Sequence, residues 1–166
     1  MVMDSDVQDA INEQIGQELY AAYLYLAMSA HFEVKSLLGF AKWMRLQAEE
    51  ELGHAMRLFD YMNRRGAEVV FGGIEAPHDE FGEPLKNFET ALAHEKEVTE
   101  LIHGLYDLAV SKHDHATQLE LQWFITEQVE EEDSIGTIVD QLRMAGDNEA
   151  AILLLDRELA TRSTAE

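Results

Sequence analysis

The segment FGGIEAPHDEFGEP, residues 71–84, decides the fold because it interrupts a sequence that is otherwise typical of α-helices. It contains both prolines of the chain and three of its glycines, and helical periodicity is lost across residues 67–84. Proline and glycine both disfavour a helix interior. A connection of this length without secondary structure is unusual in a compact domain, but a four-helix bundle with one crossover needs it. We therefore expect the segment to travel the length of a bundle.

Amphipathic patterns on both sides of this segment predict the helices. They are expected at about residues 5–33, 38–65 and 84–112, then from a tight corner at 113–115 to 145, and finally at about 148–161. At about 1.5 Å per residue the second helix spans roughly 40 Å, a distance that about eighteen extended residues can cover. The expected fold is all-α. It is an antiparallel four-helix bundle with one long crossover loop and a short fifth C-terminal helix, in a single domain over residues 1–166.

Composition excludes several classes of protein. The formal net charge of −21 would repel nucleic acid on average, and a hydrophobic content of 46% argues against disorder. No apolar run is long enough to span a membrane, so no membrane association is expected. The absence of cysteine excludes disulfides and thiolate metal sites and fits a reducing compartment. The N-terminus has neither a basic region nor a long apolar run, so we expect a cytoplasmic protein.

Acidic residues lie on the apolar face of each of the four long predicted helices. In each, a glutamate replaces an apolar residue in a seven-residue repeat, and residues seven apart share nearly the same helix face. The repeats are Ile11-Glu18-Tyr25-Phe32, Met44-Glu51-Leu58, Phe88-Glu95-Ile102-Ala109 and Phe124-Glu131-Ile138. A lone buried carboxylate costs several kcal/mol unless it is paired, protonated or bound to metal. Each glutamate alone fits a surface position equally well, but the four together predict a metal site inside the bundle.

Glu51 and His54 form the strongest unit of this pattern. Residues i and i+3 of a helix project from one face, and a carboxylate with a neutral imidazole suits iron, manganese or zinc. The four seam glutamates carry −4 in total, which two divalent cations balance. We expect Glu51 to bridge, with Glu18 and His54 completing one site and Glu95 and Glu131 the other. Paired metal ions about 3.5–4 Å apart suit two-electron chemistry on a bound oxygen species.

Other residues flank this set. Tyr25 shares the face of Glu18, either as a core tyrosine or as a hydrogen-bond donor or electron source beside the metal. Gln128 lies on the inward stripe of Glu131. Three glutamates face away from the centre of the seam and are either solvated or a third cation site: Glu50, Glu127 and Glu130. Four methionines at helical spacing are predicted to fill the core: Met28, Met44, Met56 and Met62.

Several motifs, in order and at matching spacing, resemble the bacterial and archaeal non-haem ferritins over nearly the whole chain. They are NEQIGQELYAAYLYLAMSA (12–30), EEELGHAMRLFDYM (49–62), the long loop, LQWFITEQVEEE (121–132) and DRELA (156–160). The resemblance implies a homo-oligomeric hollow shell of 24 subunits that oxidises Fe(II) with O₂ or H₂O₂ and stores a ferric mineral. The fifth helix would pack around the fourfold axes of that shell.

The resemblance also implies roles for individual residues. The first iron site would comprise Glu18, Glu51, His54 and Gln128; the second, Glu51, Glu95 and Glu131; and a third, Glu50, Glu127, Glu130 and Glu131. Tyr25 and Trp123 match the tyrosine and the tryptophan beside that centre.

Two related families do not fit the sequence. A bacterioferritin would repeat the Glu-x-x-His motif in the fourth helix and would carry a haem-ligating methionine where this chain has Leu52. We therefore expect no haem. A rubrerythrin would add a cysteine-ligated iron domain. Two other functions stay open at this point: a di-metal carboxylate oxidoreductase that acts on a small molecule, and a non-catalytic helical module whose acids are structural.

Overall fold

Four long helices and one short helix make up the computed structural model, which describes residues 3–78 and 80–163. The helices are α1 (Ser5–Val34), α2 (Leu38–Arg64), α3 (Pro84–Ser111), α4 (His115–Ala145) and α5 (Glu149–Leu159). No strand occurs among the described residues, which confirms the all-α class. The predicted ends are correct to within two residues, and the largest error is at α5, which is shorter than the predicted 148–161.

Polar side chains and a glycine fix the helix ends. Asp4, Asp114 and Asn148 each accept a hydrogen bond from a backbone N–H of the following turn, which satisfies a donor that has no partner within the helix. Just beyond the end of α2, Gly66 adopts a φ of 66°, a left-handed conformation that glycine takes without strain. These local signals explain why the sequence predicted the boundaries well.

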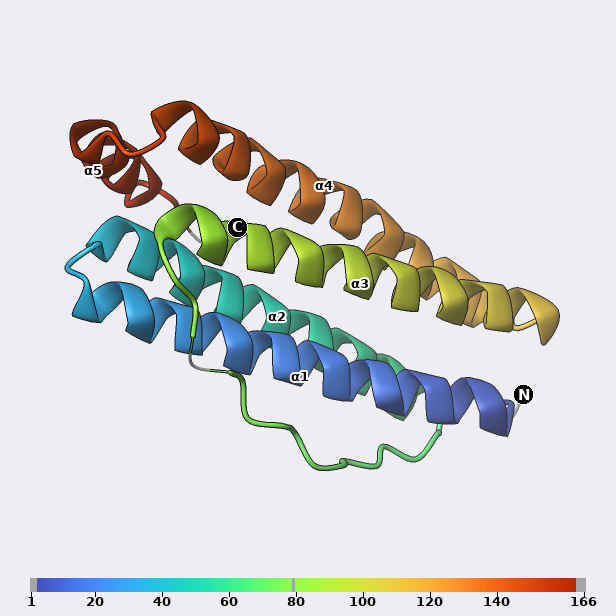
Figure 1. Ribbon diagram of the computed structural model, residues 1–166. Coiled ribbons are helices and arrows are strands. Elements are labelled where there is room, and N and C mark those ends of the chain that lie inside the picture. The colour runs from blue at the N-terminus through green and yellow to red at the C-terminus, as the bar shows by residue number, and fades with distance from the viewer. Residues whose placement is uncertain (1–2, 79, 164–166) are drawn as a thin grey trace.

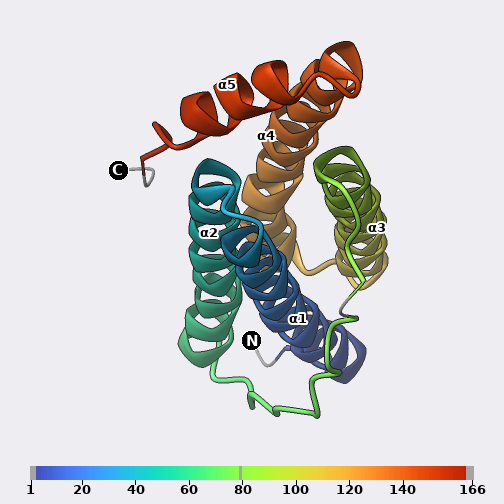
Figure 2. The ribbon, with the colours of Figure 1, turned by 60° about the vertical axis from the view of Figure 1, so that its left-hand side comes forward.

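The long helices pack in antiparallel neighbours, α1 with α2 and α3 with α4, as Figures 1 and 2 show. The connection between α2 and α3 runs beside α1 from one end of the bundle to the other, which confirms the predicted crossover (Figure 1). Gln8 and Asn12 hold its first part: their side-chain oxygens accept from the backbone N–H groups of Glu68 and Val70. The crossover is therefore attached to α1 by hydrogen bonds to its backbone.

Helix α5 lies across one end of the bundle, against α2 and α4 (Figure 2). Its Asp156 carboxylate accepts a hydrogen bond from the backbone N–H of Phe40, at 2.9 Å. A Cβ at Gly39 would lie only 1.6 Å from the Asp156 carbonyl oxygen, so only glycine permits this approach. The start of α2 and the end of α5 are thus fitted to one another.

The apolar core is divided into two clusters by a polar layer. One cluster, at the α5 end, is built around Phe32, Phe40 and Phe88, and the other, at the opposite end, includes Ile11 and Phe124. Between them lie buried polar residues, among them Glu18, Glu51 and Glu95. Met28, Met44 and Met62 are buried as predicted, but the prediction for Met56 was wrong, since it is 45% exposed on the outer face of α2. No helix in the described part of the chain has the length and apolarity to cross a bilayer.

Candidate metal centre

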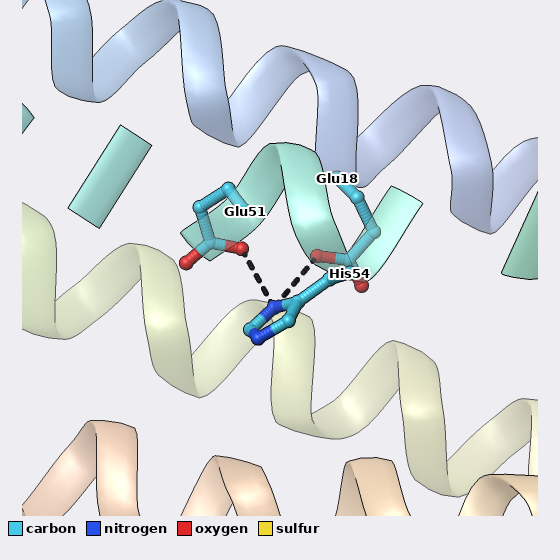
Figure 3. A group of neighbouring side chains, drawn as sticks. All are labelled: Glu18, Glu51 and His54. Atoms are coloured by element: carbon cyan, nitrogen blue, oxygen red, sulfur yellow. Dashed lines mark hydrogen bonds and ion pairs between the residues drawn. The ribbon is translucent and has the colours of Figure 1, made fainter. Parts of the chain in front are cut away.

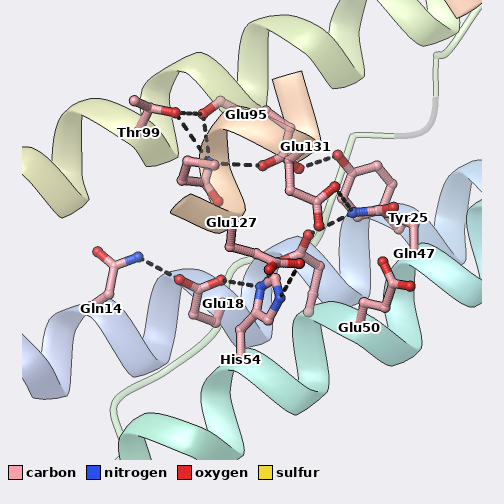
Figure 4. Close-up of polar contacts among 12 residues, drawn as sticks. Gln14, Glu18, Tyr25, Gln47, Glu50, His54, Glu95, Thr99, Glu127 and Glu131 are labelled. Atoms are coloured by element: carbon pink, nitrogen blue, oxygen red, sulfur yellow. Dashed lines mark hydrogen bonds and ion pairs between the residues drawn. The ribbon is translucent and has the colours of Figure 1, made fainter. Parts of the chain in front are cut away.

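The polar layer brings together all seven residues that the sequence placed at the inner site. We call these residues the buried layer: Glu18 and Tyr25 from α1, Glu51 and His54 from α2, Glu95 from α3, and Gln128 and Glu131 from α4. Figure 4 shows Glu18, Tyr25, His54, Glu95 and Glu131. Each is at most 5% exposed. The seven-residue spacing places each of them on the inward face of its helix, and the bundle brings the four faces together at one level.

Glu18, Glu51 and His54 form one half of the buried layer (Figure 3). His54 Nδ1 lies 3.2 Å from Glu51 Oε2 and 3.7 Å from Glu18 Oε2. One ligand atom from each residue lies within 4.8 Å of the other two. Two carboxylates and the imidazole nitrogen therefore surround one point, as the predicted first site requires.

Glu95 is the centre of the other half. Its carboxylate accepts a hydrogen bond from the Tyr25 hydroxyl and another, of 3.2 Å, from Gln128 Nε2. The Gln128 amide also donates to the Glu95 carbonyl oxygen and to Thr99 Oγ1. Gln128 thus faces Glu95, whereas the resemblance had associated it with Glu18 and His54. Tyr25 contacts the carboxylate of Glu95, which fits the interpretation as a hydrogen-bond donor beside the centre.

Gln47 links the two halves. Its Nε2 donates to Glu51 Oε1 at 3.0 Å and to Glu131 Oε2 at 2.7 Å, so one amide holds carboxylates from α2 and α4. Gln14 plays a similar part on α1, where it donates to Glu18 Oε1 at 2.8 Å. Neither glutamine was predicted as part of the site. The detectable signal was their spacing, because each precedes its glutamate by four residues on the same helix face.

Two carboxylate oxygens of the buried layer have no hydrogen-bond partner, Glu18 Oε2 and Glu131 Oε1. Buried polar atoms are nearly always paired in folded proteins, so each such atom needs an explanation. Both belong to residues predicted as metal ligands, and each lies beside further carboxylate oxygens. A divalent cation with a preference for oxygen and imidazole ligands, such as iron, would satisfy both atoms. The residues present therefore fit the predicted ions.

Burial favours the protonated forms of the carboxylic acids in the layer. Burial raises the pKa of Glu51 well above its usual value, and burial also raises the pKa of Glu131 to about 8. Burial raises the pKa of Glu95 too, although Tyr25 and Gln128 hydrogen-bond to it. Burial opposes a charge on His54, but interactions with Glu18 and Glu51 outweigh it and raise its pKa to about 11. A cation entering this layer has to displace protons.

The three outer glutamates, which we call the rim, differ from the buried layer in exposure. Glu127 and Glu50 are partly buried, whereas Glu130 is exposed. Glu127 Oε1 lies 3.8 Å from His54 Nε2, and Glu127, Glu131 and His54 form a second group whose ligand atoms lie within 4.8 Å of one another. The structure thus brings Glu127 to the edge of the centre. Glu50 forms an ion pair with Arg162 instead, at 2.7 Å.

An open groove of about 590 Å³ connects the surface to this edge. His54 and Glu127 form part of its lining, and so do Trp123 and Arg57. Trp123 contacts His54 edge-on, at 5.4 Å between ring centroids, and the Arg57 guanidinium lies 4.2 Å from the Trp123 ring centroid. The imidazole is therefore the contact between the groove and the buried layer.

Comparisons with known proteins identify the family of the chain. A family model described as the ferritin-like domain matches residues 8–145. The chain is 42% identical to a bacterial non-heme ferritin of Staphylococcus saprophyticus, across 98% of this chain and 97% of the relative, and 41% identical to one of Bacteroides fragilis, across 97% and 100%.

Solved structures give the same answer. An engineered closed form of the Archaeoglobus fulgidus ferritin has a TM-score of 0.97 at 44% identity, covering 98% of this chain and 99% of that one. A structure of the open pore ferritin from the same organism has a TM-score of 0.96 at 44% identity, covering 97% and 98%. The family model, the sequence identities and the fold similarity agree, and the chain therefore belongs to the ferritin family.

Proposed function

We propose that this chain is the subunit of an iron-storage cage that oxidises Fe(II) to Fe(III) within its helical bundle. One observation carries the proposal: four carboxylates and an imidazole converge at the centre of a ferritin bundle, with two buried carboxylate oxygens left without a partner. Crowded buried carboxyl groups with unpaired oxygens cost stability that an apolar core of the same volume would not lose. The layer therefore serves to bind cations.

Fe(II) is the substrate of this site. We propose that Glu18, Glu51 and His54 bind one ion, and that Glu95 and Glu131 bind a second, with Glu51 between the two. Gln47 already orients Glu51 and Glu131 together, which supports the assignment of the shared ligand. Tyr25 and Gln128 orient Glu95. These contacts fix the carboxylates before an ion arrives, so less ordering is needed on binding.

The proposed reaction balances with two iron ions. Each Fe(II) gives up one electron, and the two electrons with two protons convert one O₂ to H₂O₂, or one H₂O₂ to two waters. The protonated side chains of the layer release protons when the ions enter, and the groove beside His54 opens the layer to solvent. O₂ and H₂O₂ each accept two electrons, so either oxidant satisfies this balance.

The double substitution Glu51→Ala with His54→Ala tests the proposal. We expect the wild-type protein to oxidise added Fe(II) rapidly in air and to retain the ferric product, and the double variant to lose at least about 100-fold in initial rate, because it lacks a shared ligand and the imidazole. Glu49→Gln, on the exposed face of the same helix, is the matched control. A double variant that oxidises iron as fast as wild type would contradict the proposal.

We further propose that 24 copies form the cage, in the cytoplasm, without haem. The family membership supports a homo-oligomer, and 24 subunits of 18.8 kDa have a mass of about 450 kDa. Native mass measurement before and after iron loading tests both cage and storage. A small oligomer with the same metal affinity would instead favour an oxidoreductase acting on a small molecule. Failure of Fe(II), Zn(II) or Mn(II) to raise the melting temperature would favour a structural role for the acids.

A further inference from the structure

Arg162, just after α5, reaches from the C-terminal segment to the edge of the metal centre. Its Nη2 donates to Glu50 Oε2 at 2.7 Å and to Gln47 Oε1 at 3.0 Å, and its Nη1 donates to the Trp43 carbonyl oxygen at 3.3 Å. The guanidinium also lies 4.3 Å from the centroid of the Trp43 ring. All these partners belong to α2, although they lie more than 110 positions away along the chain.

This contact is stronger than an ordinary surface ion pair. The Arg162 and Glu50 side chains are only 20% and 27% exposed, whereas fully exposed pairs contribute little to stability. Three hydrogen bonds and a cation–π contact fix the guanidinium, and arginine is well suited to such planar, charge-assisted binding. The segment after α5 is thus held on α2 by a defined set of bonds.

Glu50 belongs to the rim, where a cation has a reason to bind. Glu50 lines the same groove as His54 and Glu127, and one ligand atom of Glu127 lies within 4.8 Å of ligand atoms of His54 and Glu131. Glu131 points one buried oxygen, Oε1, at no partner. A divalent cation bound there would be nearest to Glu127 and Glu131, and it could take Glu50 Oε2 as a ligand only by displacing the guanidinium.

We propose that Arg162 competes with a divalent cation for Glu50, so that filling the outer position releases the C-terminal segment from α2. The guanidinium supplies one positive charge to the rim and occupies Oε2 of the Glu50 carboxylate. A divalent cation that binds both oxygens of this carboxylate has to displace it, and the charge of a cation bound at Oε1 alone repels the guanidinium. Two ligands that compete for one group weaken each other by the same factor. The outer cation therefore weakens the attachment of Arg162 as much as Arg162 weakens the outer cation.

The identity of that cation as Fe(II) rests on the proposed function, but the competition itself does not. Zn(II) is a probe that binds carboxylate and imidazole ligands without redox chemistry. Gln47 connects Arg162 to the buried layer. Its amide oxygen accepts from Arg162, and its amide nitrogen donates to Glu51 and Glu131. Release of Arg162 thus also frees the acceptor side of the amide that joins the two halves of the buried layer.

Calorimetric titration of the iron-free full chain with Zn(II) tests the competition. We expect Arg162→Ala to bind the outer Zn(II) about tenfold more tightly than wild type, within the usual range of coupling between sites. Arg162→Lys keeps the charge but not the planar guanidinium, so its affinity for the outer Zn(II) should lie between those of wild type and Arg162→Ala. This conservative variant also controls for a folding defect. Arg157→Ala removes an exposed arginine of α5 and should bind as wild type does. In a Glu50→Gln background, Arg162→Ala should change nothing.

Hydrogen exchange tests the reverse direction. Zn(II) at a concentration that fills the outer position should speed amide exchange of residues 156–163 in wild type and should leave it unchanged in Arg162→Ala. Equal or weaker outer Zn(II) binding by Arg162→Ala, with normal iron oxidation, would overturn the competition and leave the proposed function intact. Failure of wild type to bind Zn(II) in the buried layer, or to oxidise iron, would instead overturn the proposed function.

Discussion

The apolar clusters at the ends of the bundle and the buried layer between them are equally inaccessible to water but differ in chemistry. Phe32, Phe40 and Phe88 contact one another at one end, at ring-centroid distances of 5.3–6.0 Å. In the layer, carboxylates from all four helices approach one another, and their burial costs free energy. We therefore expect the apolar ends to stabilise the bundle, and the layer to bind ions at a cost in stability.

A large cavity in one apolar cluster should have the largest effect on stability. Phe88 is fully buried and contacts three other aromatic rings, so Phe88→Ala should lower the free energy of unfolding by about 3–5 kcal/mol. Zn(II) affinity at a temperature where the variant is folded should stay within about threefold of wild type, because the layer is left intact. Urea unfolding and calorimetric titration measure the two quantities.

The matched control for this change is Leu119→Ala, on α4, where the leucine is 68% exposed. It should cost less than about 0.5 kcal/mol. If Phe88→Ala abolished metal binding in the folded protein, the apolar cluster would determine metal affinity as well as stability, contrary to this expectation.

Removal of a buried carboxyl group should affect metal affinity more than stability. Glu51→Gln deletes the proposed shared ligand and should lower Zn(II) affinity by about 100-fold. This is the upper end of the range for loss of a residue that hydrogen-bonds to a metal ligand. The metal-free variant should be at least as stable as wild type, because one of four crowded carboxylates is gone. Titration and thermal unfolding of the metal-free protein check this. A loss of stability in Glu51→Gln would show that the layer supports the fold even without ions.

The same contrast explains what the sequence could predict. Position in a seven-residue repeat depends only on helix geometry, so Glu18, Glu95 and Glu131 could be placed inward from spacing alone. The rim was harder, because a helix has no sharp border between its inner and outer faces. Glu50 and Glu130 have similar positions in sequence patterns, yet one is partly buried and the other exposed.

Contacts between distant parts of the chain could not be predicted. The ion pair of Arg162 with Glu50 depends on where α5 docks, and Met56 is exposed because it lines the open groove between α2 and α4. The amide orientation of Gln128 likewise depends on the approach of α3 to α4. Helix periodicity carries information about each face separately, whereas these details need the arrangement of several helices at once.

A smaller effect is expected from the hydroxyl that contacts Glu95. Tyr25→Phe preserves the ring within the apolar cluster but leaves a buried carboxylate oxygen without its donor, which should cost about 1–3 kcal/mol. The initial rate of iron oxidation should fall as well, because Glu95 is less well oriented. Tyr23→Phe, a half-exposed tyrosine two residues away, is the control. Equal rates and stabilities in the two variants would assign Tyr25 to packing alone.

For each titrating group, pH should change the stability of the metal-free protein by a small amount, and this change is specific to the buried layer. The pKa of Glu131 is about 8 in the folded chain, against 4.5 in an unfolded one, so the folded state holds more protons between those values. The stability that this proton provides is full below pH 4.5 and is lost as pH rises through about 8. Glu51 and Glu95 have raised pKa values and act in the same direction. His54, with a pKa of about 11 against 6.5 in an unfolded chain, also loses its contribution as pH rises.

The melting temperature of the metal-free protein should therefore fall progressively from pH 6 to pH 9. Each group lowers the free energy of unfolding by at most about 1.4 kcal/mol per pH unit. Zn(II) affinity should rise over the same range, because fewer protons have to be displaced, and the zinc-bound protein should show a flatter profile. Glu131→Gln should remove one part of the slope, whereas Glu132→Gln, at a partly buried position beside it, should retain the slope. A metal-free protein that becomes more stable between pH 6 and pH 9 would mean that the carboxylates are already ionised, and that the apolar ends stabilise a layer far more costly than its protonated form.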